Sequence, residues 1–157
     1  MKAMLQILET KIPAPVVAAV LGVSMKAYVV GGGILVDPSL LRMQLGVGLA
    51  QVSALLVLAA LACMAWSRTT INPIDPTRAS RLVTGGVYRF SRNPMYLSLL
   101  MLLVAYAVRI ESPAVWLAPL FFVAYVTRFQ ILPEERVLAQ KFGGDYQAYR
   151  QRTRRWI

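Results

Sequence analysis

The chain has no histidine and a single cysteine, Cys63, among its 157 residues. Without histidine no imidazole can serve as a general base, and a zinc site built from cysteine and histidine is excluded. A lone cysteine cannot form an intrachain disulfide, and its place inside an apolar run indicates an ordinary packing residue. Acidic residues are scarce too, because 7 Asp and Glu stand against 17 Lys and Arg.

Charged residues make up only 15% of the chain and hydrophobic residues 57%, which is unlike a soluble domain. Several apolar runs approach the ~20 residues that cross a bilayer as a helix. The net charge of +10 does not indicate a nucleic-acid partner, because the basic residues flank the apolar runs. The N-terminus lacks the apolar core and cleavage site of a signal peptide. We expect it to lie on the membrane surface as a short amphipathic segment.

We therefore predict an all-α integral membrane protein that forms one domain over residues 1–157, with about four transmembrane helices and a helical C-terminal tail on the cytosolic face. The predicted spans are residues 14–36, 43–66, 95–110 and 113–131. The first contains Lys26, which we expect to snorkel toward the interface. The second has Gly46, Ala50 and Ala54 at intervals of four residues, a pattern that permits close helix packing. The last two are short and joined by a tight turn, so they predict a helical hairpin.

The loop over residues 67–94 ends in a helix start. Asn93 is a preferred N-cap residue, and Pro94 suits the first helical position. The free N–H groups of such a helix start attract a carboxylate or a phosphate, and Arg92 adds positive charge. Gly86 lets the preceding chain turn tightly. The sequence therefore predicts an anion-binding turn, or at the least a basic loop before a well-capped helix.

The tail over residues 133–157 predicts two short helices. Pro133 suits the first turn of a new helix that runs to residue 142, with Glu134 and Glu135 at its positive end. Gly143 ends that helix. Asp145 can cap a last helix that runs to about residue 155.

Counting basic residues predicts the orientation. With four spans and the N-terminus inside, Arg42 and Arg109 lie outside and Lys26 within the bilayer. The other 14 of the 17 Lys and Arg then lie on the cytoplasmic side, as the positive-inside rule requires. Both termini are therefore expected in the cytoplasm.

Two sequence blocks carry a resemblance. G-x-Y-R-x-x-R-N-P-M-Y (residues 86–96) is followed by E-E-x-x-L-x-x-x-F-G-x-x-Y-x-x-Y (residues 134–149) and a closing R-W-I. Together they resemble the isoprenylcysteine carboxyl methyltransferase family, part of a broader group of membrane methyltransferases that includes the phospholipid N-methyltransferases. The resemblance covers residues 68–157. Many relatives carry His where Asn93 stands and Gly where Ser98 stands.

The resemblance implies a methyltransferase that uses S-adenosyl-L-methionine at the cytosolic interface and acts on an apolar or lipid-attached acceptor, such as a prenylcysteine carboxylate. We expect the helix start to take the methionyl carboxylate, and the resemblance implies that Tyr88 and Tyr96 surround the nucleoside. The candidate cofactor residues are Leu82, Val83, Gly86, Tyr88, Arg92, Asn93, Pro94, Tyr96 and Tyr149. The catalytic candidates are Arg128, to orient an acceptor carboxylate, and Glu134 or Glu135.

Other interpretations remain open at this point. The acceptor is alternatively a phospholipid amine or a small thiol, and a non-catalytic membrane adaptor with a basic tail is a further alternative. The tyrosines alternatively form an aromatic belt at the interface. Arg128 and Glu135, seven residues apart, share a face of a continuous helix and alternatively form a structural ion pair. The basic tail suits anionic headgroups. No metal is expected.

Overall fold

The computed structural model describes residues 11–67 and 81–157. The predicted N-terminal amphipathic segment and most of the first part of the loop lie outside these ranges. All regular elements within them are helical: α2 (Ala14–Gly32), α3 (Leu40–Trp66), η2 (Gly86–Arg89), α4 (Pro94–Val108), η3 (Pro113–Trp116), α5 (Leu117–Val126), η4 (Thr127–Ile131) and α6 (Leu132–Arg152). Besides the helices, the described part holds one isolated bridge, between Val36 and Ile110. The predicted all-α class is confirmed.

Three helical stretches are long and apolar enough to cross a membrane: Ala14–Gly32, Leu40–Trp66 and Pro113–Arg152. The first is shorter than predicted, because Gly33 adopts a left-handed conformation and ends it. The second begins three residues early, at Leu40, because the Ser39 hydroxyl accepts a hydrogen bond from the Arg42 amide at 3.3 Å.

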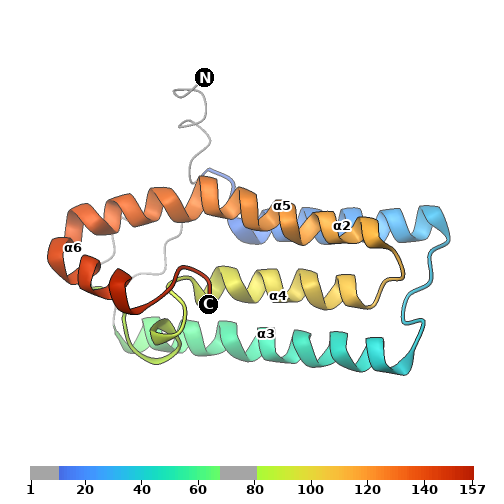
Figure 1. Ribbon diagram of the computed structural model, residues 1–157, viewed down its shortest axis with the longest axis horizontal. Coiled ribbons are helices and arrows are strands. Elements are labelled where there is room, and N and C mark those ends of the chain that lie inside the picture. Colours follow the sequence, from blue (N-terminus) through green and yellow to red (C-terminus); the bar gives the residue numbers. More distant parts are fainter. Residues whose placement is uncertain (1–10, 68–80) are drawn as a thin grey trace, which may run out of the picture.

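The short helix α4 lies at the centre of the bundle, between α3 on one side and α2 and α5 on the other (Figure 1). Its 15 residues extend ~22 Å, less than the ~30 Å of a hydrocarbon core. Packing against α3 is close, since a Cβ on Gly46 would lie 2.7 Å from the Ala105 carbonyl oxygen. The buried Ser53 hydroxyl donates to the Ser98 carbonyl at 2.7 Å. Of the predicted small-residue stripe, Gly46 is buried, whereas Ala54 is exposed.

The end of the bundle where α4 finishes, called here the distal end, is tied by an ion pair. Arg109 donates from Nε to Asp37 Oδ1 at 2.8 Å and from Nη2 to Oδ2 at 2.6 Å. The Asp37 amide in turn donates to the Arg109 carbonyl at 2.7 Å. The hydrogen bonds from Arg109 hold the pKa of Asp37 below its ordinary value. This contact joins the α2–α3 connection to the end of α4.

Pro133 lies in the first turn of α6, as predicted, but α6 is not a separate helix, because α5, η4 and α6 form one continuous helical rod (Figure 1). Pro133 has no N–H group and its ring would clash with the carbonyl four residues earlier in a regular α-helix. The chain avoids this with a wide π turn over Thr127–Ile131, in which the Leu132 amide donates to the Thr127 carbonyl. The predicted break at Gly143 is confirmed as a kink with φ 48° and ψ −118°. The last helical segment ends at Arg152, short of the predicted residue 155.

Candidate active site

The loop before α4 packs against the end of α3, at the end of the bundle opposite the distal end. Gly86 has φ +57°, and a Cβ there would clash with the Cys63 sulfur, so this position needs glycine. The predicted tight turn is confirmed. The turn buries Tyr88, and burial, together with the nearby Cys63 and Glu134, raises the Tyr88 pKa above its ordinary range.

The C-terminal segment after α6 folds back onto the start of α4. The Arg92 amide donates to the Arg154 carbonyl at 3.0 Å, and Asn93 Nδ2 donates to the Arg155 carbonyl at 3.0 Å. The Ser91 hydroxyl also donates to the Arg155 carbonyl, at 3.4 Å. Residues more than 60 positions apart in sequence are thereby joined at the predicted anion-binding turn.

Asn93 occupies the N-cap position of α4, as predicted, but its side chain makes no cap hydrogen bond. The side-chain cap predicted for Asn93 is therefore wrong. The physical reason is the carbonyl of Arg155, a strong acceptor that takes the side-chain N–H of Asn93. The side chain of Asn93 thus holds the tail and leaves the first-turn amides of α4 uncapped.

A buried ion-pair network lies directly beneath the tail. Arg92 Nη2 lies 2.7 Å from Glu135 Oε1, with side-chain exposures of only 9% and 10%. Arg155 contacts both oxygens of the same carboxylate, at 3.0 and 2.8 Å. Arg92 Nη1 donates to the carbonyls of Arg150 and Thr153 at 3.3 and 3.2 Å. Burial alone would raise the pKa of Glu135, but Arg155 and Arg92 outweigh it and hold that pKa below its ordinary value.

Glu134 faces a different environment, although it is the adjacent residue. It lies beyond the apolar part of the rod, which ends at Ile131. Tyr96 donates a short hydrogen bond from its hydroxyl to Glu134 Oε1. Burial raises the pKa of Glu134 to about 7; the Tyr96 hydrogen bond opposes this shift and the charge of Glu135 adds to it. Glu134 is therefore a carboxylate that titrates near neutral pH.

The three predicted tyrosines are all buried, and two of them are in direct contact. Tyr88 and Tyr96 are buried, and the Tyr149 hydroxyl donates to the Tyr88 carbonyl at 2.7 Å. Tyr146, which the sequence did not single out for the site, is fully buried and meets the edge of the Tyr149 ring at 6.4 Å between centroids. The tail helix thus supplies aromatic walls to the site.

The remaining predicted residues lie around the edge of this cluster. Leu82 and Val83 are half-buried and precede the turn, and Pro94 is buried at the first position of α4. Arg128 lies in the π turn, half-buried, with its guanidinium carbon 5.4 Å from the centre of the Phe129 ring. Glu135 forms ion pairs with Arg92 and Arg155, two partners that the sequence analysis did not assign to it.

Arg155, like Tyr146, is a site residue that the sequence prediction missed. The signal was present in the closing R-W-I, which we assigned only to lipid headgroups. Its bidentate contact with Glu135 depends on the fold-back of the tail, which no local pattern reveals. Trp156 is half-buried against the hydrophobic core, so the fold-back is anchored by packing as well.

The side chains present suit a zwitterionic ligand that also carries a nucleoside. Among the described residues, Arg92 Nε is buried and has no hydrogen-bond partner, and the uncapped start of α4 lies next to it. Both are suited to a carboxylate. Glu134 suits a cationic group, and the buried tyrosines suit an aromatic base. Across residues 11–67 and 81–157 there is no cluster of three metal-ligating His, Cys, Asp or Glu side chains.

Comparison with known proteins agrees with this arrangement. The chain matches the phospholipid methyltransferase family over residues 41–145, from the start of α3 into α6. An uncharacterized protein of Haemophilus influenzae is 41% identical over 63 residues, which are 40% of this chain and the whole of that protein. No solved structure matches. The family match covers well over half of the chain, and together with the three apolar helices it shows that the chain belongs to the phospholipid methyltransferase family of integral-membrane methyltransferases.

Proposed function

We propose that the protein transfers a methyl group from S-adenosyl-L-methionine to a lipid-borne acceptor at the cytosolic interface of a membrane. The observation that carries this proposal is the pair of consecutive glutamates. Glu135 is neutralised by two arginines, whereas Glu134 lies beside the uncapped start of α4 and accepts a hydrogen bond from the Tyr96 hydroxyl. The site thus combines a fixed scaffold with one titratable group.

The start of α4 and the residues around it would bind the cofactor. The Arg92 Nε proton and the first-turn amides would hold the methionyl carboxylate. Tyr88, Tyr96 and Tyr149 would flank the nucleoside, with the backbone of Leu82, Val83 and Gly86 beside it. When bound, S-adenosyl-L-methionine supplies an electrophilic methyl group to the lone pair of the acceptor.

The chain's own contribution to the chemistry is alignment and one proton transfer. An amine or a thiol must lose a proton, and Glu134 is placed to accept it because its pKa of about 7 matches the working pH. The Tyr96 hydroxyl keeps the carboxylate oriented. Alignment in a closed site supplies the rest of the rate enhancement.

A lipid-borne amine is the acceptor that Glu134 favours. A carboxylate acceptor needs no base, and its charge would be repelled by ionised Glu134. The prenylcysteine carboxylate implied by the resemblance stays the second candidate, and Arg128 is the residue that would orient it. Product analysis after incubation with labelled cofactor and a lipid extract separates the two, because amine methylation survives mild alkali and a methyl ester does not.

Calorimetric titration of S-adenosylhomocysteine into the purified protein in lipid nanodiscs tests the proposal. We expect saturable binding that is weakened at least tenfold by Arg92→Lys, which removes the Nε donor, and unchanged in Glu111→Gln, an exposed distal-end control. No binding by the wild-type protein would overturn the proposal and favour a non-catalytic adaptor.

A further inference from the structure

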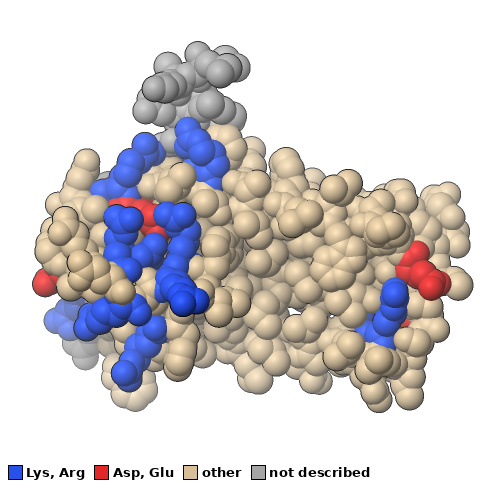
Figure 2. All heavy atoms as spheres, viewed as in Figure 1, with Lys and Arg blue, Asp and Glu red and all other residues tan. Residues whose placement is uncertain are grey.

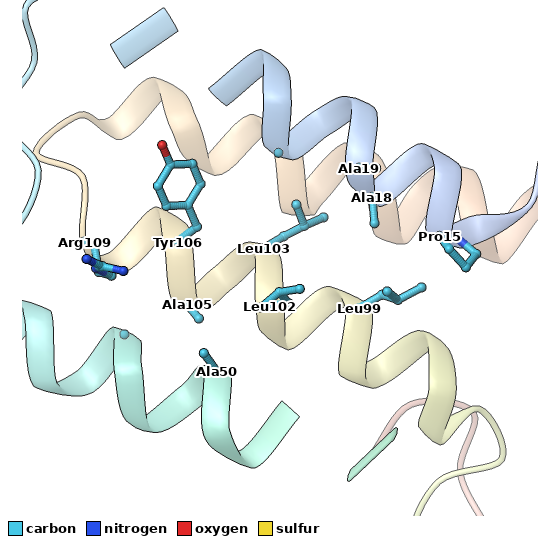
Figure 3. A pocket seen from close by; sticks show the side chains of 12 residues that line it. Pro15, Ala18, Ala19, Ala50, Leu99, Leu102, Leu103, Ala105, Tyr106 and Arg109 are labelled. Atoms are coloured by element: carbon cyan, nitrogen blue, oxygen red, sulfur yellow. The ribbon is translucent and has the colours of Figure 1, made fainter. Parts of the chain in front are cut away.

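A groove runs along the bundle between α2 and α3. Both helices pack on α4, which forms its floor (Figure 3). The groove has a volume of about 450 Å³. Its walls carry small side chains, among them Ala18 and Gly22 on α2 and Ala50 on α3. The floor is made of larger apolar side chains such as Leu103.

The groove follows the same face of α4 as Tyr96 of the candidate active site. Leu99, Leu103 and Tyr106 line it, and they follow Tyr96 at intervals of three, four and three residues. That spacing places all four on one face of α4. The groove therefore begins one helical turn along α4 from Tyr96, whose hydroxyl binds Glu134, the group proposed to take the acceptor's proton.

The other end of the groove is closed by Arg109. A Cβ on Gly46 would clash with the stem of the Arg109 side chain, so this stem crosses from α4 onto α3 where the glycine leaves room. The guanidinium is neutralised by Asp37 and offers no open charge to the groove. From Leu99 to Arg109 the floor extends ~15 Å along the helix.

We propose that this groove binds one aliphatic chain of the methyl acceptor, with the reactive head at Glu134, and that Arg109 limits the length of the chain. The inference rests on the proposed function for the identity of the head group. Both walls are helices able to span a membrane, so the groove opens toward hydrocarbon. Lipid tails are as apolar as the groove, so the groove selects a chain by shape and contact rather than by removing it from water.

A second copy of the chain is the competing occupant, and the volume argues against it. A helix of ~10 Å diameter that filled a ~15 Å length would occupy roughly 1,200 Å³. The whole atom-free space of the groove, its open mouth included, is about 920 Å³, which is still less than such a helix needs. A neighbouring helix would therefore rest on the rim and leave the floor uncovered, whereas a single extended chain reaches the floor.

Photocrosslinking tests the groove without any need for methyl transfer. The probe is a phosphoethanolamine with one hexadecanoyl chain that carries a diazirine near its end, in nanodiscs of dioleoyl phosphatidylcholine. We expect saturable labelling of the α4 peptide around Leu103 and Tyr106, competed by the unlabelled lipid. Gly22→Leu fills the groove and should lower this labelling at least fivefold. Gly48→Leu is the matched control, because a Cβ meets nothing within 4 Å at either glycine and Gly48 does not line the groove.

Labelling that does not saturate, or that is equal in Gly22→Leu and Gly48→Leu, would overturn the inference. So would labelling that appears only when a dimer dissociates on size exclusion, since the occupant of the groove in the dimer would then be a second copy. Saturable labelling without S-adenosylhomocysteine binding would support a lipid chain in the groove but contradict the proposed function. If the groove and the proposed function are both upheld, Gly22→Leu should raise KM for the lipid about fivefold or more, with kcat and cofactor affinity unchanged.

Discussion

Glu134 and Glu135 differ in what surrounds them, although the two residues are adjacent in the chain. Arg92 and Arg155 neutralise Glu135, so we expect Glu135→Gln to leave a buried arginine poorly compensated and to destabilise the protein by about 3 kcal/mol. Glu134→Gln should fold normally, because burial disfavours its charge, but should lower methyl transfer about 100-fold or more. Denaturant unfolding in detergent and product formation measure the two effects. If Glu134→Gln lost stability instead, and Glu135→Gln lost activity while it folded normally, the assigned roles of the two glutamates would be contradicted.

The pH dependence follows from the same pair. In the protein Glu134 has its pKa raised to about 7 from 4.5, so kcat/KM should rise with pH up to about 7 and then level off, because only the ionised form accepts a proton. Glu134→Gln should lack this limb. In Asn93→His the limb should persist unchanged, because position 93 holds the tail and does not exchange protons. A new ionisation near pH ~6.5 in that variant would contradict this role.

Stability should respond to pH in opposite senses at the two glutamates. For Glu134 the folded state binds more protons than the unfolded state between pH 4.5 and about 7, so its contribution falls as pH rises through that window. For Glu135 the folded pKa is lowered, so its contribution is present above its ordinary pKa and is lost as the pH falls below it. Denaturant midpoints of wild type, Glu134→Gln and Glu135→Gln from about pH 2 to pH 8 distinguish the two.

At the scale of single residues, the sequence predicted which residues share the site but not which atoms form hydrogen bonds. The motif spacing pointed to Arg92, Tyr96 and both glutamates, and all four lie in one cluster. The partner of Asn93 could not be predicted, because the Arg155 carbonyl lies 62 residues away and approaches only when the tail folds back. Local cap preference favoured the wrong acceptor for that reason.

At the scale of elements, the π turn and the tail give the site its shape. A regular helix through Pro133 would clash with an upstream carbonyl, and the π turn over Thr127–Ile131 relieves this while keeping α5 and α6 on one rod. Helix signals in the sequence predicted a break at proline, since that is the commoner outcome. They also predicted the kink at Gly143 correctly, because a left-handed residue there favours glycine.

The tail after α6 is expected to act as a clamp on the site. Truncation after Arg152 removes the carbonyls that hold Ser91 to Asn93 and the guanidinium that shares Glu135. Helix content by circular dichroism should be nearly unchanged, whereas S-adenosylhomocysteine affinity should fall at least tenfold. Removal of Ile157 alone is the control, since that side chain is 78% exposed. Full affinity in the longer truncation would show that the tail does not shape the site.

The whole molecule is strongly asymmetric in charge. Lys and Arg gather over the end that carries α6 and the tail, whereas the middle of the face in view is almost free of charge (Figure 2). At the distal end two basic residues, Arg42 and Arg109, are offset by Asp37 and Glu111. Composition and charge distribution predicted this arrangement well, because a bilayer constrains where charges can lie. The number of helices that cross is less well defined by sequence, because α4 falls short of a full span.

The charge asymmetry predicts the orientation of the protein in the membrane. We predict that α2, α3, α4 and the rod that begins with α5 each cross the membrane, an even number of crossings that would place both termini on one side. The positive-inside rule then puts the basic end in the cytoplasm. In a Cys63→Ala background, Glu111→Cys at the distal end should react with a membrane-impermeant maleimide on intact cells. Gln151→Cys, exposed on α6, should react only after permeabilisation. Reaction of both sites on intact cells would require an odd number of crossings, and the candidate active site would then face away from the cytosolic supply of cofactor.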